Sequence, residues 1–347
     1  MVRSMWQRLS DPAHVFVIAE AGVNHNGNMT VARRMIDAAC RAGADAVKFQ
    51  TFIPQDLASA KAPKAKYQKA STGGNESQLD MLAKLALSFE NTAKLKEYCR
   101  AKGILFLSSP FDIQSVDFLD SIGMTAFKIP SGELTNSLLL EHIASKRKEV
   151  ILSTGMANLP EISKAIQVLK SKGCANITLL HCVSSYPTDV KDANLKAIQT
   201  LNKHFKVPVG YSDHTLGTDI ALAAVALGAG IIEKHFTLDR TMKGPDQRLS
   251  LEPDELAAMI TSIRRVSLSL GDGTKVMRPC EKDTALAARK SIVAARDIPK
   301  GALIRRDMLA VKRPGTGLSP LELKNVIGKK SRRHLRPDDV LKSGDVS

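Results

Sequence analysis

Residues 207–248 read VPVGYSDHTLGTDIALAAVALGAGIIEKHFTLDRTMKGPDQR. Two short apolar runs in this stretch, Val207–Tyr211 and Ile231–Phe236, each end in a polar cluster that contains a histidine. Between them, Thr218–Leu227 is rich in Ala and Leu and stops at Gly228, a pattern typical of a helix. A strand, a helix and a second strand of these lengths form a right-handed parallel crossover.

This crossover brings the carboxyl ends of its two strands side by side. His214 and His235 lie at or just past those ends, so we expect their imidazoles to converge. Asp213, Glu233 and Asp246 are close to them in the sequence, and converging imidazoles beside carboxylates are typical of a divalent-cation site. For either histidine alone, a strand cap is the simpler interpretation. Their placement on consecutive strands favours the metal site.

The same alternation of strand and helix continues on both sides of this stretch. The apolar runs are Val15–Ala19, Ala46–Phe49, Ile104–Leu107, Ala126–Ile129, Val150–Leu152, Ile177–Leu180, Val207–Tyr211 and Ile231–Phe236. The predicted helices between them include Thr30–Arg41, Glu90–Ala101, Pro160–Lys170 and Pro253–Leu270. Eight β/α units in about 255 residues predict a (β/α)8 TIM barrel. A doubly wound open sheet is the alternative, but its GxGxxG fingerprint is absent.

The rest of the chain divides around this barrel, which we assign to residues 1–270. Residues 53–88 form a long insertion after the second strand, predicted to be a loop with a short helix that covers the rim. Residues 271–287 read as a linker. Residues 288–347 have short strands and glycine turns and predict a small β-rich module.

Composition narrows the class of protein. Five cysteines without a CxxC pair favour reduced thiols and a cytoplasmic enzyme. The longest apolar run, Ile220–Ile232, is too short to cross a membrane. The net charge is +15, and residues 273–347 carry 18 Lys and Arg against 8 Asp and Glu. This segment has no aromatic residue to stack bases, so we expect no nucleic-acid partner, and a basic module that covers a site for acidic substrates.

In a barrel, the carboxyl ends of the strands form one rim, and that rim holds the chemistry. The polar residues that follow the strands are Glu20, Lys48, Gln50, Ser109, Lys128, Ser131, Glu133, Ser153, Ser184, Tyr186, Ser212, His214, Glu233 and His235. Two lysines, several hydroxyls and two histidines on one rim suit a small, strongly anionic ligand such as a phosphate ester beside a metal.

Specific motifs carry a resemblance over nearly the whole chain. They are Ile18–Gly27, Val47–Phe52, Phe127–Glu133, Ile151–Met156, His181–Pro187, Tyr211–Gly217, Glu233–Phe236 and Gly244–Asp246, with Ala288–Ser291 and Lys312–Gly317 near the C-terminus. In this order they resemble the sialic acid synthases, including the C-terminal antifreeze-like (SAF) domain of that family.

The resemblance implies a reaction and its partners. The family condenses phosphoenolpyruvate with an N-acylated amino sugar, depends on a divalent metal, and forms a domain-swapped homodimer. We therefore expect N-acetylneuraminate synthase activity on N-acetylmannosamine, with legionaminate or pseudaminate synthesis from a diacetamido-trideoxy sugar as the alternative. The expected metal is Mn²⁺, with Mg²⁺ or Co²⁺ as alternatives.

The resemblance also implies roles for residues of this chain. His214 and His235 would bind the metal. Phosphoenolpyruvate would be held by Lys48, Lys128, Ser109, Ser131, Ser153 and Ser212. The sugar would meet Glu20, Gln50, Tyr186, Asp246 and, from the partner chain's SAF domain, Arg313. Some family members have Asn in place of Ser184 and Thr in place of Ser109, and both replacements keep a hydrogen-bonding group.

Three questions stay open at this point. Glu133 follows Ser131 and could orient or deprotonate a water molecule, or it could simply be a carboxylate at a helix N-terminus. A Schiff-base aldolase that uses Lys128 or Lys48 as its nucleophile is a second enzyme hypothesis. A binding protein that recognises a polyanion or ice through its small module is a hypothesis of another class.

Overall fold

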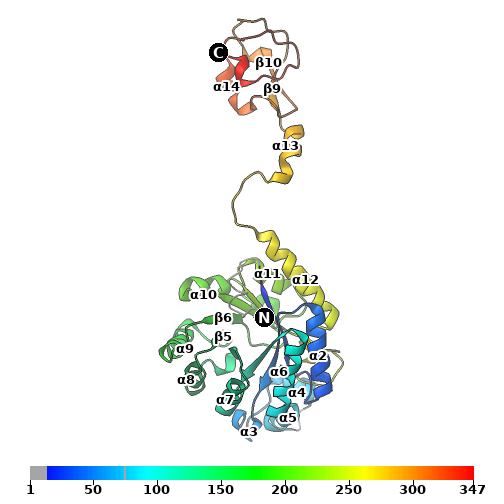
Figure 1. Ribbon diagram of the computed structural model, residues 1–347, viewed down its shortest axis with the longest axis vertical. Helices are drawn as coiled ribbons and strands as arrows, with labels where there is room; N and C mark the ends of the chain where they lie inside the picture. Colours follow the sequence, from blue (N-terminus) through cyan, green and yellow to red (C-terminus); the bar gives the residue numbers. More distant parts are fainter. Residues whose placement is uncertain (1–13, 74–75) are drawn as a thin grey trace. The chain divides into compact units, whose positions relative to one another are not determined.

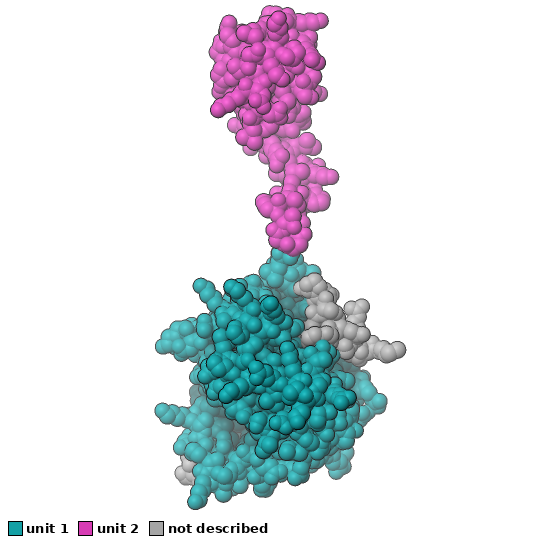
Figure 2. Space-filling view, turned by 90° about the vertical axis from the view of Figure 1, so that its left-hand side faces the viewer, with its two compact units in different colours: residues 1–271 teal, residues 272–347 magenta. Residues whose placement is uncertain are grey.

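A computed structural model describes residues 14–73 and 76–347 of the chain. Residues 1–271 and 272–347 form two compact units, coloured separately in Figure 2. Each unit has its own apolar core. None of the described helices is long and apolar enough to cross a membrane.

The first unit is the predicted barrel, with eight parallel strands surrounded by helices (Figure 1). The strands are β1 (Phe16–Gly22), β2 (Ala46–Thr51), β3 (Leu105–Pro110), β4 (Ala126–Ile129), β5 (Glu149–Ser153), β6 (Ile177–Cys182), β7 (Val209–Asp213) and β8 (Ile231–His235). Their order is β3-β2-β1-β8-β7-β6-β5-β4, and the end strands β3 and β4 also lie against each other. The prediction of a (β/α)8 barrel is confirmed.

The helices of the barrel are α2 (Met29–Ala42), α6 (Phe89–Lys102), α7 (Ile113–Ser121), α8 (Ser137–Ser145), α9 (Leu159–Ser171), α10 (Ala197–Phe205), α11 (Asp219–Ala226) and α12 (Pro253–Leu270). Five of them, α2, α6, α9, α11 and α12, agree with the predicted ranges to within a few residues, and α7, α8 and α10 were not assigned from the sequence. Local chemistry explains their ends. The Asn28 side chain accepts the amides of Thr30 and Val31 at the start of α2, and Gly43 ends that helix in the left-handed conformation with φ 82°.

Burial explains why the strands read as unbroken apolar runs. Every residue of β1 is buried, because its two faces meet the barrel interior and the helix layer. Among the polar exceptions, Glu20 lies near the carboxyl end of β1, and Lys48 and Glu233 lie in the middle of β2 and β8. These three buried charges face one cavity, whereas the buried carboxylate of Asp45 lies just before β2, at the amino-terminal end of the strands.

The insertion after β2 is more ordered than the predicted loop with one short helix. Its described residues contain three short helices, α3 (Pro54–Leu57), α4 (Lys66–Thr72) and α5 (Gln78–Leu85). Ser77 caps α5 by accepting the amide of Asp80, and the Asp80 carboxylate accepts the amide of Ser77 in return. Met81 and Leu85 then pack with Val23 in a small apolar cluster.

The second unit holds a two-stranded antiparallel sheet of β9 (Ser291–Ala294) and β10 (Leu309–Lys312), with the short helix α14 (Leu323–Val326). Ile292, Ile298 and Leu335 are fully buried in its core. The stretch predicted as a linker includes most of α13 (Lys282–Ala288).

Candidate active site

Two histidines meet at the carboxyl ends of β7 and β8. The ring centroids of His214 and His235 lie 5.5 Å apart. The ring of Tyr186 packs 4.2 Å from that of His214 and edge-on to that of His235, at 6.1 Å. The parallel crossover predicted from the sequence therefore does bring both imidazoles together at the carboxyl ends of β7 and β8.

Beside the histidines, two lysines and two glutamates form a buried network. Lys48 Nζ lies 2.8 Å from Glu20 Oε2 and 3.6 Å from Glu233 Oε2, and Lys128 Nζ lies 3.2 Å from Glu233 Oε1. The Ser212 hydroxyl donates to Glu233 Oε1 at 2.8 Å. Glu233 thus stands between the two ammonium groups and joins four strands of the barrel.

The two carboxyl groups of this network differ strongly in acidity. Burial raises the pKa of Glu20 to about 7, although Lys48 acts in the opposite direction. Glu233 is buried as well, but Lys128 and Lys48 bring its pKa down to about 2. Glu233 is therefore a permanent anion, whereas Glu20 can carry a proton near neutral pH.

The two histidines also differ in the protonation of their imidazole rings. His214 Nδ1 lies 2.8 Å from the carbonyl oxygen of Val183. Because a carbonyl can only accept, Nδ1 carries the proton, and Nε2 is left for another partner. Burial and the neighbouring charge of His214 hold the pKa of His235 well below its usual value, so this imidazole is neutral.

Serine hydroxyls line another part of the site. Ser109 Oγ accepts from Lys48 Nζ at 3.2 Å, and Ser131 Oγ accepts the amide of Gly155 at 3.0 Å. Gly155 is required here, since a Cβ atom would collide with the hydroxyls of Ser184 and Ser131.

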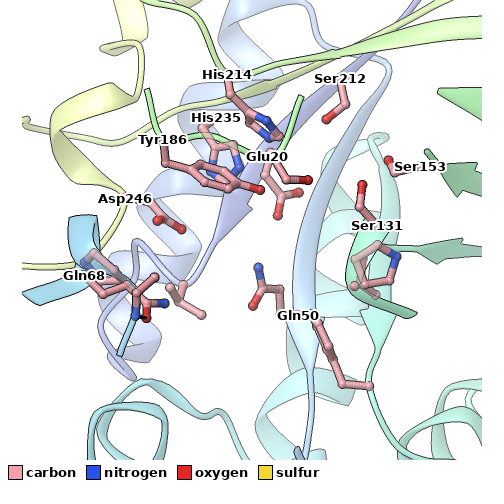
Figure 3. A pocket seen from close by; sticks show the side chains of 18 of the residues that line it. Glu20, Gln50, Gln68, Ser131, Ser153, Tyr186, Ser212, His214, His235 and Asp246 are labelled. Atoms are coloured by element: carbon pink, nitrogen blue, oxygen red, sulfur yellow. Dashed lines mark hydrogen bonds between the residues drawn. The ribbon is translucent and has the colours of Figure 1, made fainter. Parts of the chain in front are cut away.

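These side chains surround a cavity of about 450 Å³ (Figure 3). Fourteen of the predicted site residues line it: Glu20, Lys48, Gln50, Ser109, Lys128, Ser131, Ser153, Ser184, Tyr186, Ser212, His214, Glu233, His235 and Asp246. In Figure 3, Ser131, Ser153 and Ser212 lie on one side of the cavity, and Gln68 and Asp246 on the other. The Ser153 hydroxyl, His235 Nδ1 and Asp246 Oδ1 are buried and have no hydrogen-bond partner among the described residues. Unpaired polar atoms that surround a cavity indicate a missing ligand.

Three predicted residues, Asp213, Glu133 and Arg313, do not line this cavity. Asp213 instead pairs with Lys234 at 2.7 Å. Glu133 lies in the short 3-10 turn Ser131–Glu133, and its carboxylate accepts from the Asn136 amide at 2.7 Å. This position favours its alternative interpretation as a carboxylate near the start of a helix. Arg313 is exposed on the second unit, where the described residues offer its guanidinium no hydrogen bond or ion pair.

The sequence interpretation missed two groups of lining residues. Cys182, at the end of β6, lies 3.4 Å from Ser131 Oγ and 3.9 Å from His214 Nδ1. Its spacing of two from Ser184 could have revealed it, because alternate strand residues share a face. The other group comes from the insertion, which the sequence did predict to cover the rim, and includes Tyr67, Gln68 and Met81. The sequence did not show which of its side chains line the cavity.

The two imidazoles are of a kind that could serve as ligands of a divalent cation. The described residues contain no group of three or more His, Cys, Asp and Glu arranged to hold an ion. His235 and a deprotonated Nε2 of His214 could still contribute, because protein hydrogen bonds do not engage them in a way that would prevent it. Substrate and water oxygens would then complete the coordination, as at open catalytic metal sites.

An (α/β) barrel with a charged, hydroxyl-lined rim cavity defines the class as a barrel enzyme that handles a small polar substrate. The family model for the NeuB family matches residues 35–275, and that for the SAF domain matches residues 289–347. The chain therefore belongs to the NeuB family of nonulosonic acid synthases and carries a C-terminal SAF domain.

Individual relatives cover nearly the whole chain. The N,N'-diacetyllegionaminic acid synthase of Campylobacter jejuni is 48% identical over 94% of this chain and 98% of its own. The N-acetylneuraminate-9-phosphate synthase of Homo sapiens is 37% identical over 94% of this chain and 91% of its own. The crystal structure of the N-acetylneuraminic acid synthetase of Leptospira borgpetersenii, in complex with citrate, is similar with a TM-score of 0.69 and 41% identity, over 78% of this chain and 90% of that one.

Proposed function

We propose that this protein condenses phosphoenolpyruvate with a 2,4-diacetamido-2,4,6-trideoxyhexose and water, which yields a legionaminate-type nonulosonic acid and phosphate. The observation that carries this proposal is one cavity that combines an anion-binding side with two converging imidazoles. The sequence interpretation put N-acetylmannosamine first. Greater similarity to a diacetyllegionaminic acid synthase than to a sialic acid synthetase favours the alternative sugar.

The anion-binding side suits phosphoenolpyruvate. Lys128 and the hydroxyls of Ser131, Ser153 and Ser212 offer one ammonium and several neutral donors. Lys48 offers a second ammonium, held by Glu20 and Ser109. Glu233 balances part of this positive charge before the substrate arrives, so the lysines are ordered without a bound anion.

The reaction joins the methylene carbon of phosphoenolpyruvate to the aldehyde carbon of the open-chain sugar, using the electron pair of the enol double bond. Water then adds to the carbon that carries the phosphate oxygen and loses a proton, and cleavage of the carbon–oxygen bond releases phosphate. A divalent cation, Mn²⁺ with Mg²⁺ or Co²⁺ as alternatives, would be held by His214 and His235 and would supply Lewis acidity. The aldehyde oxygen gains negative charge as the new bond forms, and Glu20 can donate a proton to it from its carboxyl group. Tyr186 and Asp246 lie close to the histidines and would orient the sugar.

The test is a phosphate-release assay with phosphoenolpyruvate and a panel of sugars. We expect release only when both substrates are present, with the diacetamido-trideoxyhexose used better than N-acetylmannosamine. No release with any of these sugars would overturn the proposal. A Schiff-base aldolase would instead be inactivated by borohydride with substrate and would stay active in EDTA.

The basic SAF domain and the expected domain-swapped homodimer belong to this proposal too. In such a dimer, the SAF domain of the partner chain would bring its Arg313 to the sugar bound in this chain's barrel. A guanidinium there can donate to an acyl carbonyl and a hydroxyl together. Polyanion binding by the SAF domain alone predicts no turnover, so the phosphate-release assay also separates these hypotheses.

A further inference from the structure

The cavity has an apolar side that the reaction chemistry does not use. Six apolar side chains from the insertion and neighbouring loops line it: Val23, Leu57, Met81, Leu82, Leu85 and Phe111. We call these six residues the insertion wall. They contrast with the lysines, glutamates, histidines and hydroxyls that line the rest of the cavity.

The side chains of the insertion wall are held in place by packing within the chain. Met81 and Leu85 are 3% and 7% exposed and pack with Val23 and Phe52, while Leu82 is only partly buried at the cavity. Leu57, at the end of α3, packs against the same cluster. This packing fixes the shape of the wall without a ligand, as expected for a preformed binding site.

Positive charge is lacking at this wall. Among the described residues that line the cavity, the only Lys or Arg side chains are Lys48 and Lys128, and both are held by Glu20 or Glu233. The insertion has a buried lysine of its own, Lys64, but its ammonium donates to Thr72 Oγ1 and pairs with Glu76. A phosphate group placed against the wall would therefore have no free cationic partner among the described residues of the same chain that line the cavity.

We propose that the insertion wall recognises the end of the sugar opposite its aldehyde, selecting a methyl-bearing, uncharged end and excluding a 6-phosphorylated one. This inference rests on the proposed function. If phosphoenolpyruvate occupies the lysine and serine side and the aldehyde lies at the histidines, the apolar side is left for the sugar's far end. Burial of a methyl group there is favourable, whereas a phosphate dianion would lose hydration without compensation.

Leu82 is the residue that tests this selection, since it reaches the cavity but is not part of the buried centre of the cluster. In Leu82→Lys, the ammonium would face the sugar's far end. Ala83→Lys is the matched control, because it adds the same charge one residue further along α5 at an exposed position. Leu57→Lys places the charge on another part of the wall and serves as the second variant if Leu82→Lys does not fold.

The experiment measures kcat/KM for 2,4-diacetamido-2,4,6-trideoxymannose and for N-acetylmannosamine 6-phosphate, with KM for phosphoenolpyruvate as an internal reference. We expect the ratio of the two kcat/KM values to exceed about 100 in the parent chain and to fall by about tenfold or more in Leu82→Lys. KM for phosphoenolpyruvate should stay within about twofold, and Ala83→Lys should behave like the parent.

Three outcomes would overturn the inference. A parent chain that prefers the phosphorylated sugar contradicts the selection directly, although its proposed condensation chemistry would stand. If the ratio of the two kcat/KM values is unchanged in both wall variants, or changes equally in Ala83→Lys, the insertion wall does not select the sugar. A parent chain that releases no phosphate with any sugar overturns the proposed function and this inference with it.

Discussion

Lys234 and Asp213 form a buried ion pair, with 2.7 Å between Nζ and Oδ2, on the strands that end at the two histidines. Both side chains are at most 1% exposed, and the Lys234 ammonium also donates to the carbonyl of Thr215 at 2.6 Å. Since His214 and His235 line the cavity, their neighbours Asp213 and Lys234 point to the opposite face of β7 and β8. The pair therefore ties the two strands together behind the histidines.

Loss of one partner of this pair should destabilise the barrel strongly. Lys234→Met leaves the Asp213 carboxylate buried without its cation, and we expect a loss of about 3–5 kcal/mol in the free energy of unfolding. Denaturant unfolding followed by circular dichroism measures this change. The control is Lys191→Met, whose lysine forms an exposed pair with Asp189 and should cost less than about 1 kcal/mol. Similar losses in the two variants would show that the buried pair has no special role.

The metal hypothesis predicts that both histidines are needed for the same bound ion. His214→Ala and His235→Ala should each abolish turnover and reduce the Mn²⁺ bound after gel filtration, measured by elemental analysis. Both proteins should keep the circular dichroism spectrum of the parent. His204→Ala, at an exposed position on α10, is the control and should retain metal and activity. Full activity of either site variant in chelated buffer would remove the metal hypothesis.

The anion-binding hypothesis predicts an effect on phosphoenolpyruvate first. Lys128→Met removes the ammonium that lies 3.2 Å from Glu233, so the site loses one positive charge next to a permanent carboxylate. We expect KM for phosphoenolpyruvate to rise by about tenfold or more and kcat to fall. Lys48→Met should act in the same direction. If both variants bind phosphoenolpyruvate as tightly as the parent, the serine side of the cavity has been misassigned.

Some of this site follows from sequence alone because parallel strands impose simple geometry. His214 and His235 could be placed together because one crossover joins their strands, and Lys48 shares a face with Gln50 by alternation. Cys182 could have been found by the same rule. These inferences depend only on local pattern and on barrel topology.

Other features depend on contacts that a local pattern does not encode. The insertion wall forms because α5 folds back onto Val23 and Phe52, and the sequence of residues 53–88 does not show which of its apolar faces is buried. The pairing of Lys234 with Asp213 likewise requires the register between β7 and β8. Each of these features is set by tertiary packing.

Asp45 should make the free energy of unfolding of the barrel depend on pH in the acidic range. This carboxylate lies just before β2 and accepts from the amide of Val17 at 2.8 Å and from the guanidinium of Arg264 at 2.7 Å. Burial alone would raise its pKa, but these donors outweigh burial and lower it. A lowered pKa means that the stabilisation is fully present above the unfolded-state value of about 3.9 and is lost as the pH falls through the folded-state value.

The comparison of the parent with Asp45→Asn tests this linkage. Above about pH 5, we expect the variant to be less stable by about 1–3 kcal/mol, because the amide cannot replace the charge-assisted bonds. The difference should shrink as the pH drops below about 4, measured by urea unfolding at each pH. Asp192→Asn, at an exposed position, should show no such trend. A difference that stays constant down to pH 3 would contradict the linkage.

Arg313 is held by a fixed backbone while its own side chain is exposed. The carbonyl of Pro314 accepts from Ser291 Oγ at 2.7 Å, and the amide of Gly317 donates to the same hydroxyl at 2.9 Å. Gly315 lies so close to Arg289 that a Cβ atom would meet its side chain at 2.6 Å. A rigid loop with one free guanidinium is suited to presenting that group to a ligand.

If Arg313 reaches the barrel of the partner chain in a swapped dimer, its replacement should affect the sugar alone. Arg313→Ala should raise KM for the sugar by about tenfold or more and leave KM for phosphoenolpyruvate nearly unchanged. Mixing Arg313→Ala chains with His214→Ala chains should restore activity, because each heterodimer then contains one site with both groups intact. Arg332→Ala, at an exposed position in the same unit, controls for a general loss of positive charge. Verified heterodimers without recovered activity would mean that Arg313 does not complete the partner's site.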